Sequence, residues 1–431
     1  NRIEEIIWET RPDLQQTFFP ASPYFLIELR EWIVESGLEE MNIDWKHNFI
    51  YKVLNNIIQI KKQNISKLSK HGFNILGYQN YLLGLGQAAR DYFEIIDNIG
   101  IETSSYSFTN NLSKPIKDNP GNKLEGLIFD KNIVVIGADQ MSVIDRLAFK
   151  GWNKFKYNIG VIFWEIDTLN KEMAENLAIF DEFIVSSTYI FEVLRQYTNK
   201  KISILNLPVK KIVPNKKIIN NEELNLFINF DFLSDIYRKN IFQLVHFFKE
   251  INNEYKDKLN LFIKSSNSKF FPNETVYLGK MINDYKSIKW VDGNMEREEY
   301  LKIQNDTDLY VSLHRSEGFG LGLAEAMARG VSVLATNYSG NLDFMTGDNS
   351  YLIDYNLVET NKFKRSPYSK YGGKWADPSL DDFKNKVNNF MQDFENRQNK
   401  INNAINDVNT KLSLEFISKN FKRIISKSGL I

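Results

Sequence analysis

Two successive series of alternating strand-like and helix-like segments constrain the fold of this chain more than any other feature. The first series has its apolar, strand-like runs at 73–77, 132–136, 157–164, 182–186 and 202–205. The second series has its runs at 224–230, 259–265, 288–291, 309–313 and 331–335. Strands that alternate with helices at this spacing predict a parallel sheet covered on both faces. We therefore expect two α/β halves of similar size.

A lysine-rich segment with two prolines, residues 208–217, separates the two series and is typical of a linker. The predicted domains are accordingly 71–208 and 209–410. Residues 411–431 predict a C-terminal helix that could pack back on the N-terminal domain.

Residues 1–70 contain no Gly-bounded, β-branched runs and show helical spacing, which predicts a helical extension. Its segment 45–68 carries an apolar stripe with lysines lying largely off it. Two interpretations stay open: a basic amphipathic helix that touches a membrane or a polyanion, and a helix that packs on a domain with one solvated face.

Composition narrows the class of partner. Basic and acidic residues both number 54, so no global field attracts nucleic acid. The chain has no cysteine, which excludes disulfides, thiolate metal sites and cysteine nucleophiles, and we expect a cytoplasmic protein. No apolar run approaches the ~20 residues that span a bilayer, and no basic-then-apolar leader is visible. Any membrane association is therefore expected to be peripheral, at the inner face.

The segment 310–345 is the most informative for function. Its strand-like run leads into Ser316-Glu317-Gly318-Phe319-Gly320, which places these residues at the carboxyl end of a sheet, where open α/β sheets bind ligands. Glycines let backbone amides approach an anion, and the following helix offers its positive N-terminal end. This arrangement predicts a phosphate seat.

Two glutamates flank that seat. Glu325 follows Glu317 by eight residues, so its carboxylate lies about a turn and a half into the helix while Glu317 stays in the loop. Carboxylates pair well with vicinal hydroxyls, so the arrangement suits a sugar or ribose attached to a phosphate. An amphipathic helix with two surface glutamates would not require the glycines at 318, 320 and 322.

The run from Glu317 to Met327, E-G-F-G-L-G-L-A-E-A-M, resembles the signature of retaining GT-B glycosyltransferases, the family of sucrose synthase and many bacterial polysaccharide glycosyltransferases. Gly84-Leu85-Gly86, in a loop before a helix-like segment, resembles that family's N-terminal glycine loop. The resemblance implies two Rossmann-like domains facing across a cleft, here with an N-terminal helical extension. It also implies transfer of a hexose from a nucleoside diphosphate sugar, with retention of configuration, to a glycan, lipid-linked or protein acceptor.

The same resemblance implies roles for individual residues. Glu325 would hold the ribose and Glu317 the transferred sugar, while Arg238 and Lys239 would clamp the diphosphate. The donor would also contact His314, the N-terminal loop glycines Gly84 and Gly86, and the backbone of the loop after Glu317. The residues of that loop are Gly318, Phe319, Gly320 and Leu321.

Two departures from the family pattern leave roles open. A basic residue expected after the first strand of the second domain is replaced by Asn229-Phe230-Asp231, and Asp231 could orient Arg238 or Lys239. A histidine expected after a middle strand of the first domain is replaced by Phe163-Trp164-Glu165. Glu165 could serve the acceptor side, form a hydrogen bond, or merely cap a helix.

No metal or other cofactor is expected. Asp306-Thr307-Asp308 has the D-x-D form of a metal site, but it precedes its strand and so lies at the end of the sheet away from the ligand. With four histidines in the chain, a histidine zinc cluster is not expected either.

Two other function classes stay open. A catalytically silent nucleotide-sugar-binding partner in an assembly complex would fit the missing histidine and the extra helices. A dinucleotide oxidoreductase would use the glycines near Gly84, but it gives the Glu317–Glu325 pair no role.

Overall fold

The structure, a computed structural model, describes residues 72–431 apart from 110–114, 117–123, 149–151, 154–155, 215–222, 256–257 and 294, together with Arg11, Leu14, Leu29 and Trp32. The helical extension predicted for residues 1–70 lies, except for those four isolated residues, outside the described residues and stays a prediction.

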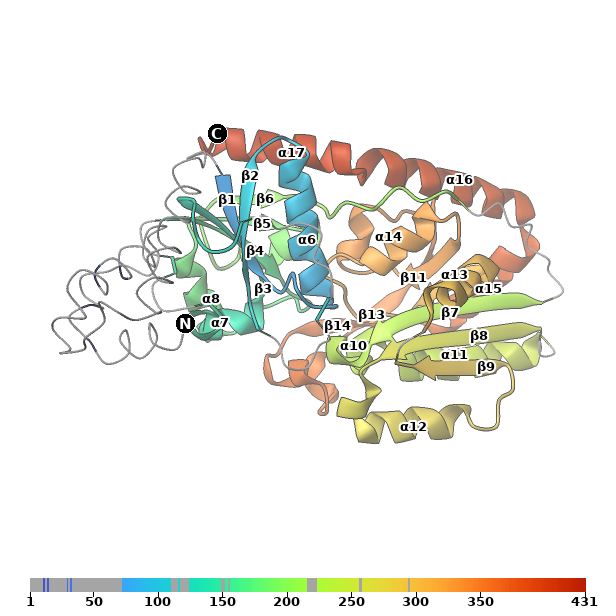
Figure 1. The fold of residues 1–431 in the computed structure, drawn as a ribbon. Coiled ribbons are helices and arrows are strands. Elements are labelled where there is room, and N and C mark those ends of the chain that lie inside the picture. The colour runs from blue at the N-terminus through green and yellow to red at the C-terminus, as the bar shows by residue number, and fades with distance from the viewer. Residues whose placement is uncertain are drawn as a thin grey trace, which may run out of the picture. The chain divides into compact units, whose positions relative to one another are not determined.

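The first sheet contains six strands in the order β2-β1-β3-β4-β5-β6, which confirms the five predicted strands of the first series and adds β2 at the edge (Figure 1). Its strands are β1 (Gly72–Gly77), β2 (Glu102–Ser107), β3 (Lys131–Gly137), β4 (Tyr157–Phe163), β5 (Glu182–Val185) and β6 (Ile202–Ile204). The helices that follow its strands are α6 (Gly84–Asp97), α7 (Ile144–Leu147), α8 (Lys171–Asn176) and α9 (Thr188–Leu194). The paired strands β1–β2, β1–β3 and β4–β5 are parallel, as the alternation predicts.

The second sheet also has six strands, in the order β12-β11-β10-β7-β8-β9. Its strands are β7 (Leu224–Asp231), β8 (Leu259–Ser266), β9 (Ile288–Asp292), β10 (Leu309–Ser312), β11 (Ser332–Thr336) and β12 (Tyr351–Ile353). Its helices are α10 (Ile236–Lys239), α11 (Ile241–Glu254), α12 (Pro272–Ile282), α13 (Arg297–Asp306), α14 (Leu321–Ala328), α15 (Leu380–Gln392) and α16 (Phe394–Lys411). Figure 1 shows α13 and α14 on one face of this sheet and α11 and α12 on the other.

The order of the second sheet creates a switch point. Strands β7 and β10 are neighbours, but the chain continues from β7 toward β8 and from β10 toward β11, in opposite directions. In open α/β sheets, ligands bind at the carboxyl ends of the strands beside such a switch point. Leu226, Ile228 and Val311 on the two strands are buried in the core beneath it.

A two-stranded antiparallel sheet follows β12 and was not predicted. It pairs β13 (Tyr355–Glu359) with β14 (Lys374–Pro378), and the chain between them forms two short 3-10 turns. The helix α17 (Leu414–Lys427) comes last, as the spacing of residues 413–426 predicts.

The chain divides into two compact units. The first comprises residues up to Ile162, Glu175–Ile184 and Phe421–Ile431, and the second comprises Phe163–Ala174 and Val185–Asn420. Among the described helices, none combines the length and the hydropathy that crossing a bilayer requires.

Candidate functional site

Glu317 lies in the loop after β10 and pairs with both cations from the end of α10. Its Oε1 is 2.5 Å from Nζ of Lys239, and its Oε2 is 3.3 Å from Nη1 of Arg238. The carboxyl ends of β7 and β10 thus bring together residues that lie far apart in the sequence. The structure places these predicted site residues at the switch point, at the carboxyl end of the sheet, as the sequence predicts.

This cluster keeps Glu317 ionised. Burial by itself would raise the pKa of the Glu317 carboxyl, but Lys239 and Arg238 outweigh it and lower that pKa to about 2. The side chain of Arg238 is only 5% exposed, whereas that of Lys239 is 21% exposed. Arg238 also donates to the carbonyl of Ser316 at 2.7 Å. Arg238 is therefore a fixed internal charge that holds the loop, and Lys239 is the cation that a ligand can reach.

The loop after Glu317 presents backbone amides. Within the described chain, the N–H groups of Gly318–Gly322 donate to no other protein group, and the last two of them lie in the first turn of α14. Gly320 has a φ of +95°, a conformation that L side chains rarely adopt. Free amides at a helix start attract anions through partial positive charge. Gly318, Phe319, Gly320 and Leu321 thus lie where the anion seat was predicted, and binding of an anion there stays a prediction.

A second loop, which contains Ser339 and Gly340, packs against the loop of Glu317 and stabilises it. The Gly340 amide donates to the carbonyl of Glu317 at 2.9 Å, and the Glu317 amide donates to Oγ of Ser339 at 2.7 Å. A Cβ on Gly340 would lie 2.2 Å from the carbonyl oxygen of Gly318, so only glycine fits there. Ser339 itself has φ 78° and ψ −150°, a region that is almost exclusive to glycine. Such strain is typical of functional loops.

His314 is completely buried beside this cluster. Its Nε2 faces two acceptors, the carbonyl of Tyr338 at 3.3 Å and Oδ1 of Asn341 at 3.1 Å, so Nε2 carries the proton. Its Nδ1 then accepts from the hydroxyl of Ser312 at 3.0 Å. Burial lowers the pKa of His314, which is therefore neutral. Both nitrogens are engaged by protein groups, and contact of His314 with a donor stays a prediction.

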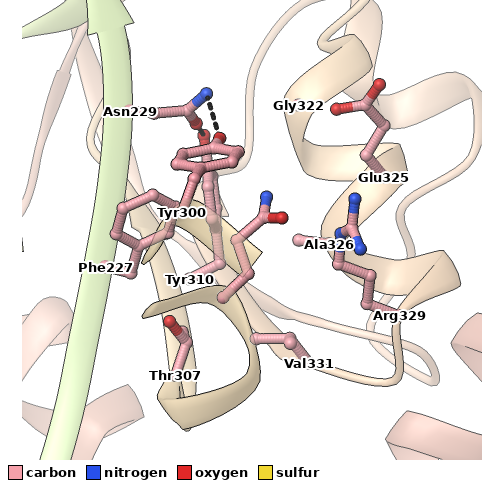
Figure 2. A pocket seen from close by; sticks show the side chains of 11 residues that line it. Phe227, Asn229, Tyr300, Thr307, Tyr310, Gly322, Glu325, Ala326, Arg329 and Val331 are labelled. Carbon is pink, nitrogen blue, oxygen red and sulfur yellow. Dashed lines mark hydrogen bonds between the residues drawn. The ribbon is translucent and has the colours of Figure 1, made fainter. Parts of the chain in front are cut away.

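Glu325 lies on α14 at the rim of a small recess between α13, α14 and the strands β7 and β10. Figure 2 shows Glu325 and Arg329 on one side of this recess, across from Asn229 and Tyr300. Two tyrosine hydroxyls fix the side-chain amide of Asn229. The Tyr310 hydroxyl donates to its Oδ1 at 2.7 Å, and its Nδ2 donates to the Tyr300 hydroxyl at 3.2 Å. Burial raises the pKa of Glu325, and Arg329 partly offsets that effect. The recess offers a carboxylate and a fixed amide to hydroxyl groups.

The prediction that Asp231 orients Arg238 or Lys239 is wrong. Asp231 accepts from the amide of Leu233 at 2.9 Å and from Asn267, because it caps the turn after β7. Asp235 is the aspartate beside Arg238: it caps α10 through the amide of Tyr237 at 2.9 Å. The sequence offered a signal for this cap, since aspartate precedes the helix-forming Ile236–Lys239, but the signal was missed.

The N-terminal glycines belong to the first unit. Helix α6 begins at Gly84, so Gly84 and Gly86 form its first turn and not the loop that was expected before it. A Cβ on Gly86 would lie 2.5 Å from the carbonyl oxygens of Tyr78 and Tyr81, so glycine is required there for close packing. A Cβ on Gly84 would have no atom of other residues within 4 Å outside its own helix backbone, and Gly84 is exposed. Donor contacts of both glycines stay predictions.

Glu165 lies in the loop after β4, in a segment that belongs to the second unit. Its Oε2 accepts from the hydroxyl of Tyr368 at 2.8 Å, and its backbone carbonyl accepts from Nε1 of Trp375 at 2.8 Å. Sequence reasoning missed Tyr368, because its segment has no feature that indicates contact with a residue so distant in the sequence.

The D-x-D segment lies where the sequence placed it. Asp308 precedes β10 and accepts from the amide of Asn225 at 2.9 Å, at the amino ends of β7 and β10. In the described part of the chain, no group of three or more His, Cys, Asp or Glu side chains is placed to hold a metal ion.

One family model matches part of the second half of the chain. Residues 216–361 match the family described as glycosyl transferases group 1. No curated protein sequence matches the chain.

Several solved structures share its fold at low sequence identity. Sucrose-phosphate synthase from Thermosynechococcus elongatus has a TM-score of 0.61 and 14% identity over 83% of this chain and 99% of that one. The lipopolysaccharide outer core galactosyltransferase WaaB has a TM-score of 0.59 and 14% identity over the same shares. A mutant of S. aureus TarM, in complex with Fondaparinux, alpha-GlcNAc-glycerol and UDP, has a TM-score of 0.52 and 16% identity over 69% of this chain. This chain spans about half of TarM, 55% of its length. The two Rossmann-like sheets are those of the GT-B fold.

Proposed function

We propose that this chain, whose residues 216–361 match the glycosyl transferases group 1 family, moves a hexose from a nucleoside diphosphate sugar to a hydroxyl acceptor with retention of configuration. The observation that carries the proposal is the ionised Glu317, held between Arg238 and Lys239 directly before the free amides of the α14 N-terminus. Such a site offers a carboxylate to sugar hydroxyls and positive charge to a diphosphate within a few ångströms.

The chemistry follows from this distribution of charge. Breaking the bond to the anomeric carbon leaves negative charge on the diphosphate, which preorganised positive groups stabilise. Lys239 and the amides of Gly318–Leu321 supply that charge, while Arg238 keeps Glu317 and the Ser316 carbonyl in place. We infer that no metal ion takes part, because these protein groups supply the positive charge that stabilises the departing diphosphate.

Glu325 would hold the ribose. Its carboxylate lies on the same helix whose start binds the diphosphate, and Asn229 is fixed across the recess from it. A uridine donor is the first candidate, since the TarM structure of the same fold contains UDP. A glycan, lipid-linked or protein acceptor, peripheral association with a membrane or an assembly complex, and a cytoplasmic location remain parts of this proposal.

A donor screen tests it. UDP-, GDP-, dTDP- and ADP-sugars are added to the full chain and thermal unfolding is recorded. A true donor at 100 times its dissociation constant stabilises the protein by ~2.7 kcal/mol. Incubation of that donor with candidate acceptors, followed by NMR of the anomeric proton, then shows transfer and its stereochemistry. Binding without transfer or hydrolysis would favour a catalytically silent nucleotide-sugar-binding partner.

A further inference from the structure

The segment between β13 and β14 contacts the loop after β4, and both belong to the second unit. The amide of Lys374 donates to Oδ1 of Asp167 at 2.7 Å, and Trp375 donates to the Glu165 carbonyl. Gly373 fits so closely that a Cβ on it would lie 2.3 Å from Cγ2 of Ile166. The family match ends at residue 361, so most of this segment lies outside it.

Tyr368 is held rigidly within that contact. Its ring packs against Trp164 and Trp375, with centroids 5.6 and 5.5 Å away. Its hydroxyl donates to Oε2 of Glu165 at 2.8 Å. The two tryptophans thus fix the position of the Tyr368 ring, and with it the direction from which the Tyr368 hydroxyl donates to the Glu165 carboxylate.

Glu165 keeps one oxygen available. Among the described residues, its Oε1 accepts no hydrogen bond, and no cation lies within 4 Å of the carboxylate. The side chain is only partly buried. A carboxylate with one oxygen fixed and the other open is suited to accept a hydrogen bond from a hydroxyl group.

Glu165 also lies close to the donor cluster. A Cβ on Gly318 would lie 3.6 Å from the carbonyl oxygen of Trp164, so the residue before Glu165 lies beside the loop that follows Glu317. Burial lowers the pKa of Arg238, but the charges of Glu317 first and Glu165 second outweigh it and raise that pKa. The Arg238 guanidinium, bonded to the loop of Glu317, is therefore near both carboxylates. A sugar held by Glu317 would lie within reach of Glu165.

We propose that Glu165 determines sugar specificity by accepting a hydrogen bond from a hydroxyl of the transferred hexose, and that Tyr368 is the residue that positions its carboxylate. This inference rests on the proposed function, which it deepens by naming a second carboxylate for the sugar.

The test compares Tyr368→Phe with Tyr371→Phe. Tyr371 packs on the same Trp164, with centroids 5.3 Å apart, and its hydroxyl has no hydrogen bond within the described chain, so it is a matched control. Calorimetry measures the affinity for the best sugar nucleotide from the donor screen and for its free nucleoside diphosphate. In Tyr368→Phe we expect the affinity for the sugar nucleotide to fall about tenfold, and that for the free diphosphate to stay within about twofold. Tyr371→Phe should match the wild type in both.

A second pair of variants separates positioning from packing. In a Glu165→Ala background, Tyr368→Phe should cause no further loss, because Tyr368 acts only through Glu165. An equal loss in both backgrounds, or wild-type affinity of Tyr368→Phe for the sugar nucleotide, overturns the inference while the proposed function stands. If the wild type binds no sugar nucleotide at all, both are overturned.

Discussion

Nζ of Lys239 lies 2.5 Å from Oε1 of Glu317, and this contact joins the two loops that meet at the switch point of the second sheet. Lys239 ends a helix of only four residues, because Asn240 adopts a left-handed conformation and separates α10 from α11. The break sets the direction of the Lys239 amine, which a continuous helix over 238–250 would not do.

Loss of the lysine charge should weaken binding of the diphosphate. For Lys239→Met we expect the affinity for the nucleoside diphosphate to fall roughly 10- to 150-fold, since charge-assisted hydrogen bonds are lost. The control is Lys384→Met, which removes a partly buried lysine that pairs with Glu254 at 2.6 Å. Equal affinities of the two variants for the nucleoside diphosphate, measured by calorimetry, would show that Lys239 does not contribute to binding.

The pKa of Glu317 makes a prediction about acid stability. Because this pKa is lowered from 4.5 to about 2, the ion pairs stabilise the fold above pH 4.5, and this contribution is lost as pH falls toward 2. Compared with Glu317→Gln, the wild type should lose about 2 kcal/mol more of its unfolding free energy between pH 4.5 and 3. Urea unfolding at a series of pH values measures this difference, and parallel curves would contradict the buried ion pairs.

Because Gly340 packs tightly against the Gly318 carbonyl, we expect that adding one methyl group at Gly340 lowers the stability of the protein. Gly340→Ala forces a Cβ against the Gly318 carbonyl and should lower the unfolding free energy by roughly 1–3 kcal/mol. Gly347→Ala is the control, since no atom lies within 4 Å of its Cβ position. Similar urea midpoints for the two variants would show that the loop at Gly340 can shift to accommodate a Cβ at little cost.

Metal independence can be tested directly. Transfer should continue at its full rate in a strong chelator, and Asp306→Ala should leave it unchanged, because Asp306 is exposed at the amino end of the sheet. A chelated enzyme that recovers only with Mg²⁺ or Mn²⁺ would show that a cation shares the charge-stabilising role of Lys239.

Much of the fold was predictable because it rests on local patterns. The apolar runs that became β3, β7 and β10 are buried strands with few alternatives. Strand β2 was missed, since its sequence E-T-S-S-Y-S has no apolar run and it lies at the edge of its sheet.

The site was predictable where one motif carries it. Glu317 and the glycines after it are contiguous in sequence, so their common location followed from the strand before them. The contacts of Glu165 were not predictable, because Tyr368 and Trp375 reach it only through tertiary packing. Asp231 ends β7 and Asp235 follows the turn after it, and the sequence did not determine which of the two would face Arg238.

The most direct test of the account measures nucleotide binding and sugar transfer in Glu317→Gln and Glu325→Ala, with Glu299→Ala, an exposed residue of α13, as control. In Glu325→Ala the affinity for the nucleoside diphosphate should fall roughly 10- to 150-fold, because bonds to the ribose are lost. In Glu317→Gln that affinity should stay near the wild-type value, while the rate of transfer falls at least about 100-fold, since Glu317 contacts the sugar where the bond breaks. Small and equal effects in all three variants, in both measurements, would contradict the proposed site.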